Sequence, residues 1–422
     1  MPLSKMGFFT LNDFNLDGKT VFVRVDINSP IDPSTGKILS YQRFQSHVET
    51  LNSLRSSKVV IMAHQSRPGK EDFLSLKEHA RALGGILGRP VSFVDNLFGD
   101  TVGREIEKLK DGDIMMLENT RFYSEEVNVN ANDAVAAEQT NIVKSLSKYM
   151  DYFVNDAFPA IHRAQVTLTG FRRIVPNIAG RLIEKEISGI ERFRKGNERP
   201  KIAILAGAKI SESIAVASSF LERGMVDRIL VGGVVANAFL WSSGYNIGKK
   251  NMDFIRKNND HHTDLIDKSR AILEKYGNRI VMPTDLILNP SGRRVELTEK
   301  IPDNEIIADI GIDSIVLFSD EIRRSKAIFL NGPMGMYEIE EYSAGTREVF
   351  NAVAGSGAVT IAGGGHTLSA LENLDLLPRI THASTGGGAL ISYLSGEKMP
   401  VIEALKESME IFGVKKDGRR DD

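Results

Sequence analysis

The chain has 422 residues, enough for two domains with separate cores, and its 42% hydrophobic and 26% charged residues are typical of a soluble globular protein. The 53 Lys and Arg nearly balance the 55 Asp and Glu, so no overall positive charge favours nucleic acid or an anionic membrane, and the absence of cysteine excludes disulfides and thiol catalysis. We expect a cytoplasmic protein, because the N-terminal segment lacks a secretory-signal pattern and no apolar run is long enough to span a membrane.

Short apolar runs recur along the chain, and each is followed by a turn signal and a segment with helical periodicity. The runs are nearly continuous in Val, Ile, Leu and Phe, as expected for parallel strands that are buried on both faces of a sheet. Their alternation with helices predicts an α/β fold with doubly wound parallel sheets. The predicted strands cover residues 19–27, 58–64, 113–119, 150–158, 201–207, 227–233, 278–285, 326–333 and 358–365.

A helix that connects two lobes is predicted at about residues 180–195. Ile183, Ile187 and Ile190 form one apolar stripe among charged residues of this segment. The glycine and the proline of "RKGNERP" then end the segment before the next predicted strand. The sequence therefore predicts a boundary between two lobes in this region.

In the first half of the chain, polar and cationic residues follow the predicted strands. The carboxyl ends of parallel strands converge on one crevice, so these residues can meet although they are far apart in sequence. Several Arg and His side chains at one edge predict a small anionic ligand such as a phosphate ester, because guanidinium groups match phosphate oxygens. The alternative is that each arginine forms an ordinary surface ion pair. The residues are Asp26, Asn28, His64, Arg67, Arg121, His162 and Arg163, with Arg43 on a predicted helix.

The second half contains five junctions in which a strand, a glycine turn and a helix follow one another. They are "LAGAKIS", "VGGVVANAF", "LNGPMGMYE", "AGGGHT" and "STGGGA". Such turns let backbone N–H groups approach a phosphate at the positive end of a helix dipole, so together they predict a nucleotide site. A single glycine turn could equally serve close packing of helix and sheet. Neither a GxxxxGK[ST] loop nor a GxGxxG dinucleotide pattern is present.

In chain order, these junctions resemble the motifs of phosphoglycerate kinases. The motifs "VRVDINSP", "AHQSRP", "ENTRF" and "VNDAFPAIHRA" resemble the first lobe of that family, and "AGAKIS", "VGGVVANAF", "ADIG", "LNGPMGMYE", "AGT", "GGGHT" and "STGGGA" resemble the second. The resemblance extends from about residue 19 to about residue 405. It implies two Rossmann-like lobes joined by a helix and a hinge. The phosphoglycerate lobe would comprise residues 1–178, completed by 403–422, and the nucleotide lobe residues 179–402.

The resemblance also implies a reaction. It is the reversible transfer of a phosphoryl group between ATP and the carboxylate of 3-phospho-D-glycerate, giving ADP and 1,3-bisphosphoglycerate in glycolysis and gluconeogenesis, with Mg²⁺ accompanying the nucleotide and the lobes closing around the substrates. A carboxylate is already ionised near neutral pH, so the reaction needs positioning and charge neutralisation rather than a general base. The implied partners are these small molecules, with no nucleic acid or membrane, and we expect a monomer.

Carried over to the matching positions, the resemblance assigns roles to individual residues. Arg43 and Lys209 would be catalytic, because both would neutralise charge on the moving phosphoryl group. The phosphoglycerate would contact Asp26, Asn28, Arg43, His64, Arg67, Arg121 and Arg163. The nucleotide would contact Gly207, Lys209, Gly232, Gly311, Asn331, Pro333, Glu338, Gly364, Gly365, His366 and Thr367.

Three positions depart from the common pattern of the family. Ala206 replaces a glycine, and Ser213 stands where many members have a second lysine for nucleotide phosphate. His366 stands where most bacterial and eukaryotic members have an aspartate that binds magnesium, and the histidine resembles the archaeal branch. Magnesium prefers oxygen ligands, so we do not expect His366 to bind it; the candidates are the Thr367 hydroxyl, water and the nucleotide phosphates, which we expect to hold Mg²⁺ in the main.

Two other classes of function stay open. One is a bilobed binding protein that closes on an anion without turnover, which predicts no nucleotide binding by the second lobe. The other is a different acyl-phosphate kinase or a dehydrogenase, and the missing P-loop and dinucleotide patterns count against it.

Overall fold

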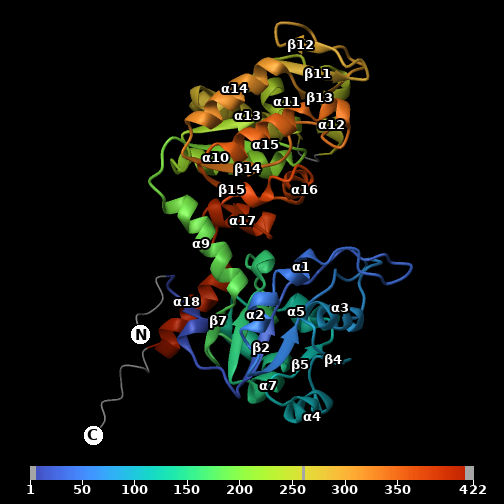
Figure 1. Cartoon of the computed structure of the whole chain (residues 1–422), viewed down its shortest axis with the longest axis vertical. Helices are drawn as coiled ribbons and strands as arrows, with labels where there is room; N and C mark the ends of the chain where they lie inside the picture. The colour runs from blue at the N-terminus through green and yellow to red at the C-terminus, as the bar shows by residue number, and fades with distance from the viewer. Residues whose placement is uncertain (1–5, 259–261, 414–422) are drawn as a thin grey trace. The chain divides into compact units, whose positions relative to one another are not determined.

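The computed structural model describes residues 6–258 and 262–413, which divide into two compact units (Figure 1). The first unit takes in the chain up to residue 188 and from residue 397 onward, and the second unit comprises residues 189–396. Helix α9 (Arg181–Lys195) runs from the first unit into the second. Within the described residues, no helix is both long and apolar enough to cross a membrane.

The two junctions between the units differ in position from the sequence-based scheme, which placed them after residues 178 and 402. The first turn of α9 is bonded to the first unit, because the N–H of Leu182 donates to Asp156 at 2.9 Å and the N–H of Arg181 donates to the Thr50 hydroxyl at 2.8 Å. The N–H of Val401 likewise donates to the carbonyl of Ile161 at 3.2 Å. Local hydrogen bonds therefore place residues 181–188 and 397–402 in the first unit.

The first unit is built on a seven-stranded sheet in which all neighbouring strands are parallel. Strand β2 lies in the middle, with β3 added on one side and β6 on the other, so the winding direction changes beside β2. A crevice forms at such a switch point, outside the carboxyl ends of the strands. In sheet order the strands are β1 (Phe9–Thr10), β7 (Asn177–Ala179), β6 (Tyr152–Asn155), β2 (Thr20–Arg24), β3 (Lys58–Met62), β5 (Ile114–Leu117) and β4 (Val91–Val94).

Alternate residues of the strands fill two cores on opposite faces of this sheet. Val21 and Val23 belong to the core that α3 (Lys77–Leu87) covers, whereas Phe22 belongs to the core beneath α4 (Asp100–Lys108). This two-sided burial is the reason that the strands are continuously apolar in sequence. The C-terminal helix α18 (Pro400–Gly413) lies beside β7 (Figure 1) and contributes Met409 and Phe412 to the first core.

The second unit contains a six-stranded parallel sheet and a small antiparallel one. In sheet order the parallel strands are β10 (Ile280–Val281), β9 (Arg228–Val231), β8 (Lys201–Leu205), β14 (Ala327–Asn331), β15 (Val359–Ala362) and β16 (His382–Ala383). Counted along the chain this is the 3-2-1-4-5-6 order of Rossmann folds, with the switch point between β8 and β14. The predicted class, two Rossmann-like doubly wound parallel sheets, is confirmed.

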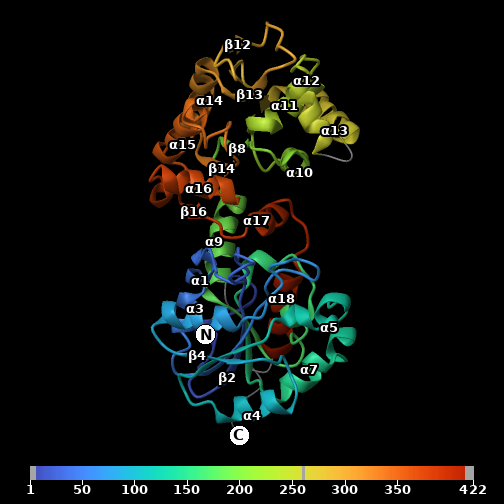
Figure 2. The same ribbon diagram turned by 90° about the vertical axis from the view of Figure 1, so that its right-hand side faces the viewer.

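Helices cover both faces of the six-stranded sheet (Figure 2). On one face, α14 (Ile312–Arg324) and α15 (Ala344–Gly355) pack on Ile328 and Leu330 of β14. On the other face, α10 (Ile210–Glu222) places Phe220 at 5.5 Å from Phe329 between ring centroids. The helices α11 (Gly233–Ser242) and α13 (His262–Tyr276) lie on the side of α10.

The antiparallel sheet was not among the sequence-based predictions. It consists of β12 (Arg294–Glu296), β11 (Asp285–Asn289) and β13 (Ile306–Ile310). Its strands are short: β12 has one apolar residue, Asp309 interrupts β13, and the apolar part of β11 is Leu286 to Leu288, so the long continuous apolar runs that indicate buried parallel strands are lacking. Strands β1, β4 and β7 of the first unit were also missed, because two to four residues are too few to show a pattern.

Candidate functional site

Asp26 lies two residues beyond the end of β2, at the switch point of the first sheet, and is 4% exposed. Arg43, from helix α1 (Gln42–Gln45), donates from Nη1 to Asp26 Oδ1 at 2.8 Å, and the N–H of Asn28 donates to the same oxygen at 3.2 Å. Burial by itself raises the pKa of Asp26, but His64 and the cationic groups Arg43 and Arg24 more than offset it and lower the pKa to about 2. Asp26 is therefore a carboxylate at neutral pH.

His64 follows β3 and lies next to Asp26, with 1% of its surface exposed. Its Nδ1 is 3.1 Å from Nη2 of Arg24, the last residue of β2. Burial lowers the pKa of His64 well below the ordinary value of 6.5; Asp26 opposes this effect, and neighbouring arginines add to it. The imidazole is therefore neutral at physiological pH.

Arg121 and Arg163 complete a group of cations around Asp26 and His64. Burial lowers the pKa of Arg121 to about 10, and repulsion by Arg163 and Arg24 contributes to this shift. Such mutual repulsion costs free energy that a bound anion would recover. The structure thus brings these arginines together at one edge of the sheet, as the strand-end pattern predicted, although the role of each residue stays a prediction.

The loop after β3 is held by Asn28 and by Arg121. The Asn28 side-chain oxygen accepts from the N–H of Ser66 at 2.9 Å, and Arg121 Nη1 donates to the carbonyl of Ser66 at 2.5 Å. Ser66 has a φ of 57°, a left-handed conformation that these two bonds maintain.

Arg67 is exposed, and no hydrogen bond or ion pair of its side chain is found in the described part of the chain. Arg163 Nε contacts His162 Nε2 at 3.3 Å.

In the second unit, three turns meet through their backbones at the switch point beside β8 and β14. The N–H of Gly207 donates to the carbonyl of Pro333 at 3.0 Å, and the N–H of Gly233 donates to that of Met334 at 2.8 Å. A Cβ atom on Gly233 would lie 2.7 Å from Gly207 N, and one on Gly332 would lie 2.0 Å from the carbonyl oxygen of Ala206. These glycines are required by close packing, which is the structural alternative that the sequence left open.

Gly232 and Gly311 are equally enclosed. A Cβ on Gly232 would lie 2.7 Å from Met334 Sδ, and one on Gly311 would lie 2.1 Å from Asp285 Oδ2. The carboxylate of Asp285 caps α14, accepting from the N–H of Ser314 at 2.8 Å and from that of Asp313 at 3.2 Å. The start of α14 is therefore occupied by a protein carboxylate.

The loop between β15 and α16 (Gly365–Asn373) is fixed on one side and open on the other. Gly364 has a φ of 92°, and a Cβ there would lie 2.7 Å from Asn331 Oδ1. The Thr367 hydroxyl is buried and accepts from the N–H of Gly332 at 2.7 Å. A Cβ on Gly365 would meet nothing within 4 Å, and this residue is exposed. The first residue of α16 thus presents an open backbone edge, as does Gly388 in α17 (Gly387–Leu394), in contrast to the enclosed glycines of the turns beside β8 and β14.

His366 and Glu338 lie near each other beside this open edge. His366 Nδ1 is 3.8 Å from Glu338 Oε1, and the two side chains are 77% and 61% exposed. Lys209, which immediately precedes α10, is 74% exposed, and its Nζ lies 3.2 Å from Glu212 Oε2. Ser213 is 2% exposed in the same helix. Among the side chains that the structure describes, no group of three or more His, Asp and Glu could hold a metal ion.

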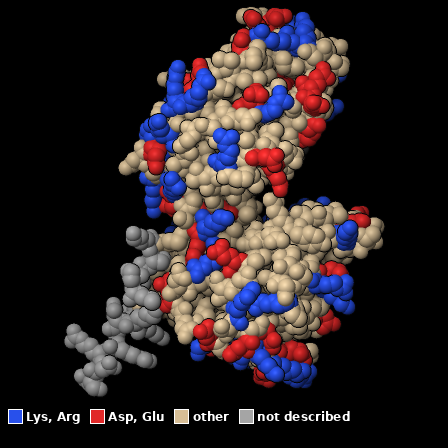
Figure 3. Space-filling model, viewed as in Figure 1, with Lys and Arg blue, Asp and Glu red and all other residues tan. Residues whose placement is uncertain are grey.

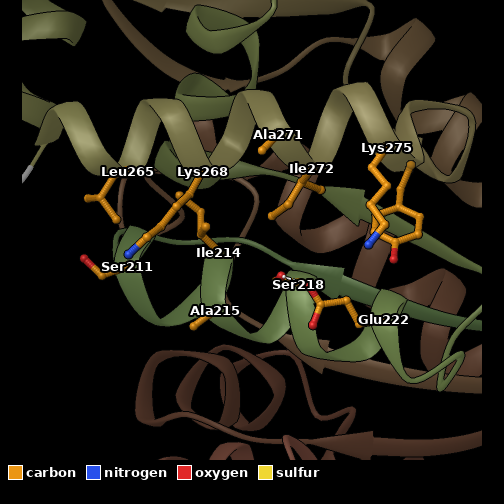
Figure 4. A pocket seen from close by; sticks show the side chains of 11 residues that line it. Ser211, Ile214, Ala215, Ser218, Glu222, Leu265, Lys268, Ala271, Ile272 and Lys275 are labelled. Atoms are coloured by element: carbon orange, nitrogen blue, oxygen red, sulfur yellow. Dashed lines mark hydrogen bonds between the residues drawn. The ribbon is translucent and has the colours of Figure 1, made fainter.

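Outside these sites, a hollow of about 450 Å³ lies between α10 and α13 (Figure 4). Its floor is apolar, with Ile214, Leu265 and Ile272, and Lys268 and Lys275 lie on its α13 side. It includes none of the predicted nucleotide residues. On the face shown in Figure 3, basic and acidic side chains are interspersed over both units, so charge on this face does not single out a ligand.

Sequence reasoning missed Arg24 and Glu126, which are both fully buried and lie 3.9 Å apart. The arginine interrupts the apolar run "VFVRVDI", and a charge inside a buried strand was the one signal that could have identified it.

One doubly wound unit has half-buried arginines near its strand ends, and the other has a glycine turn with an open helix start, so the chain is in the class of two-lobed α/β proteins suited to anionic, phosphate-bearing ligands. The chain belongs to the phosphoglycerate kinase family, whose model matches residues 11–397. It is 63% identical to the phosphoglycerate kinase of Thermoplasma acidophilum, over 96% of this chain and 99% of that one, and 45% identical to that of Methanobacterium bryantii, over 95% and 97%.

Solved structures agree with this assignment. The phosphoglycerate kinase of Pyrococcus horikoshii superposes with a TM-score of 0.87 at 40% identity, and the match covers 96% of this chain and all of that one. The phosphoglycerate kinase of Coxiella burnetii superposes with a TM-score of 0.77 at 29% identity, covering 95% and 99%. The family assignment thus holds over nearly the whole chain in both sequence and structure.

Proposed function

We propose that the chain transfers a phosphoryl group reversibly between ATP and the carboxylate of 3-phosphoglycerate, the reaction for which its relatives are named. The observation that carries this proposal is the cluster of Arg43, Arg121 and Arg163 around Asp26 and His64 at the switch point of the first sheet. The attacking carboxylate of the substrate is ionised at neutral pH, so a site of cations without a general base suits it.

The first unit binds the phosphoglycerate in this proposal. Arg121 and Arg163 repel each other in the free protein, so an anion between them would relieve that repulsion. The ionised Asp26 can accept a hydrogen bond from a substrate hydroxyl, and Asn28 keeps the neighbouring loop in place. Arg67 is exposed and free to turn toward a ligand phosphate. Arg43, bonded to Asp26, is 37% exposed and can also reach the reacting carboxylate.

The second unit binds the nucleotide in this proposal, with its phosphates at the start of α16. Gly365 offers an exposed N–H at the positive end of the helix dipole, where anions are stabilised. Lys209 and His366 are exposed side chains that can contact phosphate oxygens, and Glu338 can accept from ribose hydroxyls. The other predicted nucleotide residues are enclosed and support the turns that present these groups. They are Gly207, Gly232, Gly311, Asn331, Pro333, Gly364 and Thr367.

Gly365→Ala is expected to weaken ATP binding about tenfold while leaving the protein folded. The added methyl group meets no protein atom within 4 Å, and alanine favours a helix start over glycine, so the thermal midpoint stays equal or rises slightly. The same methyl group would obstruct the close approach of a phosphate to the backbone. Isothermal calorimetry with Mg-ATP and a thermal melt would measure the two effects.

Two other Gly→Ala variants serve as controls for that experiment. Gly355→Ala, at the end of α15, adds a methyl group with no contact closer than 3.7 Å, so it should leave the affinity unchanged and the thermal midpoint equal or slightly higher, as for Gly365→Ala. Gly364→Ala forces a Cβ to within 2.7 Å of Asn331 Oδ1 at a φ of 92°, so it should lower stability by about 1–3 kcal/mol. Equal ATP affinity in Gly365→Ala and wild type would contradict the proposed phosphate site.

Magnesium fits this unit only through oxygen ligands. His366 offers a nitrogen ligand, and Glu338 beside it is one carboxylate. The described side chains near them therefore do not form a magnesium site by themselves. Bound together with the nucleotide phosphates, Mg²⁺ would supply charge neutralisation for the transferred group. In this proposal His366 donates a hydrogen bond to a phosphate oxygen rather than binding the metal.

His366→Asp is accordingly expected to weaken ATP binding about two- to fivefold without changing the relative activity with Mg²⁺ and Mn²⁺. The new carboxylate lies near Glu338 and repels both it and the phosphates. Ser369→Asp, which places the same charge at an exposed position further along α16, is the matched control and should have a smaller effect. A shift in metal preference confined to His366→Asp would show instead that residue 366 contacts the metal.

The test of the function itself is a coupled assay with ATP, Mg²⁺ and 3-phosphoglycerate. ADP formation that requires 3-phosphoglycerate supports the proposal. Binding of both ligands without turnover would favour the bilobed binding protein, and turnover with another carboxylate alone would favour a different acyl-phosphate kinase.

A further inference from the structure

Arg24 is a charged residue that the proposed function does not use, although it lies beside the site. It is 0% exposed, and a guanidinium stays charged even when it is removed from water, so its donors need acceptors. Nε donates to the Thr167 hydroxyl at 3.0 Å, and Nη1 donates to the carbonyl of Val25 at 2.5 Å. Nη2 lies 3.1 Å from His64 Nδ1.

Glu126, in helix α5 (Ser124–Asn128), supplies the opposite charge. Its Oε1 is 3.9 Å from Arg24 Nη2, and both side chains are 0% exposed. The carboxylate also accepts from the hydroxyl of Thr167 at 2.6 Å and from the N–H of Thr167 at 2.7 Å. Thr167 therefore donates to Glu126 and accepts from Arg24, which fixes the guanidinium in one orientation.

The contact with Arg24 determines which nitrogen of His64 carries the proton. A guanidinium can only donate, so His64 Nδ1 must accept, and the proton of the neutral ring lies on Nε2. Within residues 6–258 and 262–413, no protein group hydrogen-bonds to that Nε2. The imidazole therefore has one donor left for a ligand.

We propose that Arg24 is a positioning residue of the phosphoglycerate site: held by Glu126 and Thr167, it keeps His64 in the Nε2–H form, so that the imidazole donates to an anionic oxygen of the ligand. Without this bond a neutral histidine would exchange between its two tautomers and would present a lone pair to the anion part of the time. The inference rests on the proposed function only for the identity of the ligand.

The charged groups around His64 explain why a fixed tautomer matters here. Asp26 faces it from the end of β2, Arg121 from the turn after β5 and Arg163 from the segment after β6, with Arg24 behind it. Burial and these arginines keep the pKa of His64 well below 6.5, so protonation is not available to provide the donor. A fixed neutral tautomer is the remaining way to obtain an N–H at that position.

The first experiment examines the wild-type chain without ligand. Long-range ¹H–¹⁵N correlation spectra report the tautomer of each histidine, and His64→Gln identifies the signals of His64. We expect the Nε2–H form from pH 6 to pH 8. A predominant Nδ1–H form, or protonation of His64 above pH 6, would overturn the inference.

The second experiment removes both buried charges together, in the double variant Arg24→Met with Glu126→Gln, because a single substitution would leave one charge buried without its partner. His64 should then exchange between tautomers. The Kd of 3-phosphoglycerate, measured by calorimetry, should rise about tenfold over wild type at pH 8. In a His64→Gln background the same double substitution should leave the Kd nearly unchanged, because the effect of Arg24 is transmitted through the imidazole.

A purely structural role for Arg24 would raise the Kd by the same factor with and without His64, and that result would overturn the inference. If the double variant does not fold, Thr167→Val removes a single acceptor of Arg24 and should give a smaller rise in Kd, about two- to threefold, with the same dependence on His64. Thr167→Ser keeps the hydroxyl and should restore the wild-type value. A wild type with the Nε2–H form but no 3-phosphoglycerate binding would overturn the proposed function alone.

Discussion

Lys209→Ala should lower kcat for phosphoryl transfer by about 10²- to 10³-fold, the loss typical of removing a cation that stabilises charge in the transition state. Lys209 follows the Gly207 turn, which its bond to Pro333 holds in place, so the lysine projects from a fixed point at the start of α10. Its side chain is 74% exposed and makes an ion pair with Glu212 at 3.2 Å. Such a pair contributes less than about 1 kcal/mol, so stability should not change.

The measurements for this prediction are kcat and the two KM values in the coupled assay, with a thermal melt as the test of folding. KM for 3-phosphoglycerate should stay near the wild-type value, because the residue lies in the second unit. Lys249→Ala is the matched control: it removes an exposed lysine from the first position of α12 (Lys249–Lys257) in the same unit and should leave kcat unchanged. A Lys209→Ala enzyme that retains half of the wild-type kcat would show that Lys209 is an ordinary solvated lysine.

The sheet architecture could be predicted because each long strand has a recognisable pattern of apolar residues in its own local sequence. Continuous apolar runs such as residues 58–64 and 201–207 indicate strands buried on both faces, and the structure places β3 and β8 there. The same pattern predicted that Asp26, His64 and Arg121 lie at one edge of the first sheet, since the carboxyl ends of parallel strands converge. Strands of two to four residues at sheet edges, such as β1 and β4, carry too few residues for a pattern to show.

The network behind the site could not be predicted, because its partners are far apart in sequence. Arg24 meets His64, Glu126 and Thr167 only after four elements have packed together, and nothing in the local sequence pairs them. The glycine turns show a similar limit. A glycine that binds phosphate and a glycine that avoids a clash look alike in sequence, and only the contacts separate the open Gly365 from the enclosed Gly332.

Asp309 and Asp285 show how the same residue type can have opposite effects on stability. Both are buried in the antiparallel sheet, on β13 and β11. Asp285 accepts from the hydroxyl of Ser314 at 2.6 Å and from Arg294 Nε at 2.6 Å in addition to the N–H groups of α14. Burial by itself raises the pKa of Asp285, but the groups that donate to it, with the Ser314 hydroxyl first, bring the pKa below its ordinary value.

The carboxyl group of Asp309 accepts hydrogen bonds from fewer donors than that of Asp285. Its carboxyl accepts from the N–H of Gly345 at 2.7 Å and from its neighbour Ile310 at 2.9 Å. These bonds do not offset the cost of burying the charge, and burial raises the pKa of Asp309 to about 7. A Cβ on Gly335 or on Gly345 would lie within 3 Å of this carboxyl, so no other side chain can approach from those directions.

Asp309→Asn should therefore become more stable relative to wild type as the pH rises. The folded protein binds the Asp309 proton more tightly than the unfolded chain, so wild-type stability falls as the pH rises from about 4 to about 7 and then levels off. Asparagine does not titrate. The difference in unfolding free energy should shift in favour of the variant by about 2–3 kcal/mol between pH 5 and pH 8.

Asp285→Asn is the matched variant with the opposite sign. A lowered pKa stabilises the folded protein above the unfolded pKa, and this stabilisation is lost as the pH falls, so the deficit of Asp285→Asn should shrink toward low pH. Denaturant unfolding at pH 5, 6, 7 and 8 measures the difference for Asp309→Asn, and the same measurement at and below about pH 4 is needed for Asp285→Asn, because its carboxyl is ionised in both states above that pH. A pH-independent difference for Asp309→Asn would mean that its carboxyl is ionised throughout this range. The contrast between the two variants would show that the number of hydrogen-bond donors, and not burial, decides the charge state of these aspartates.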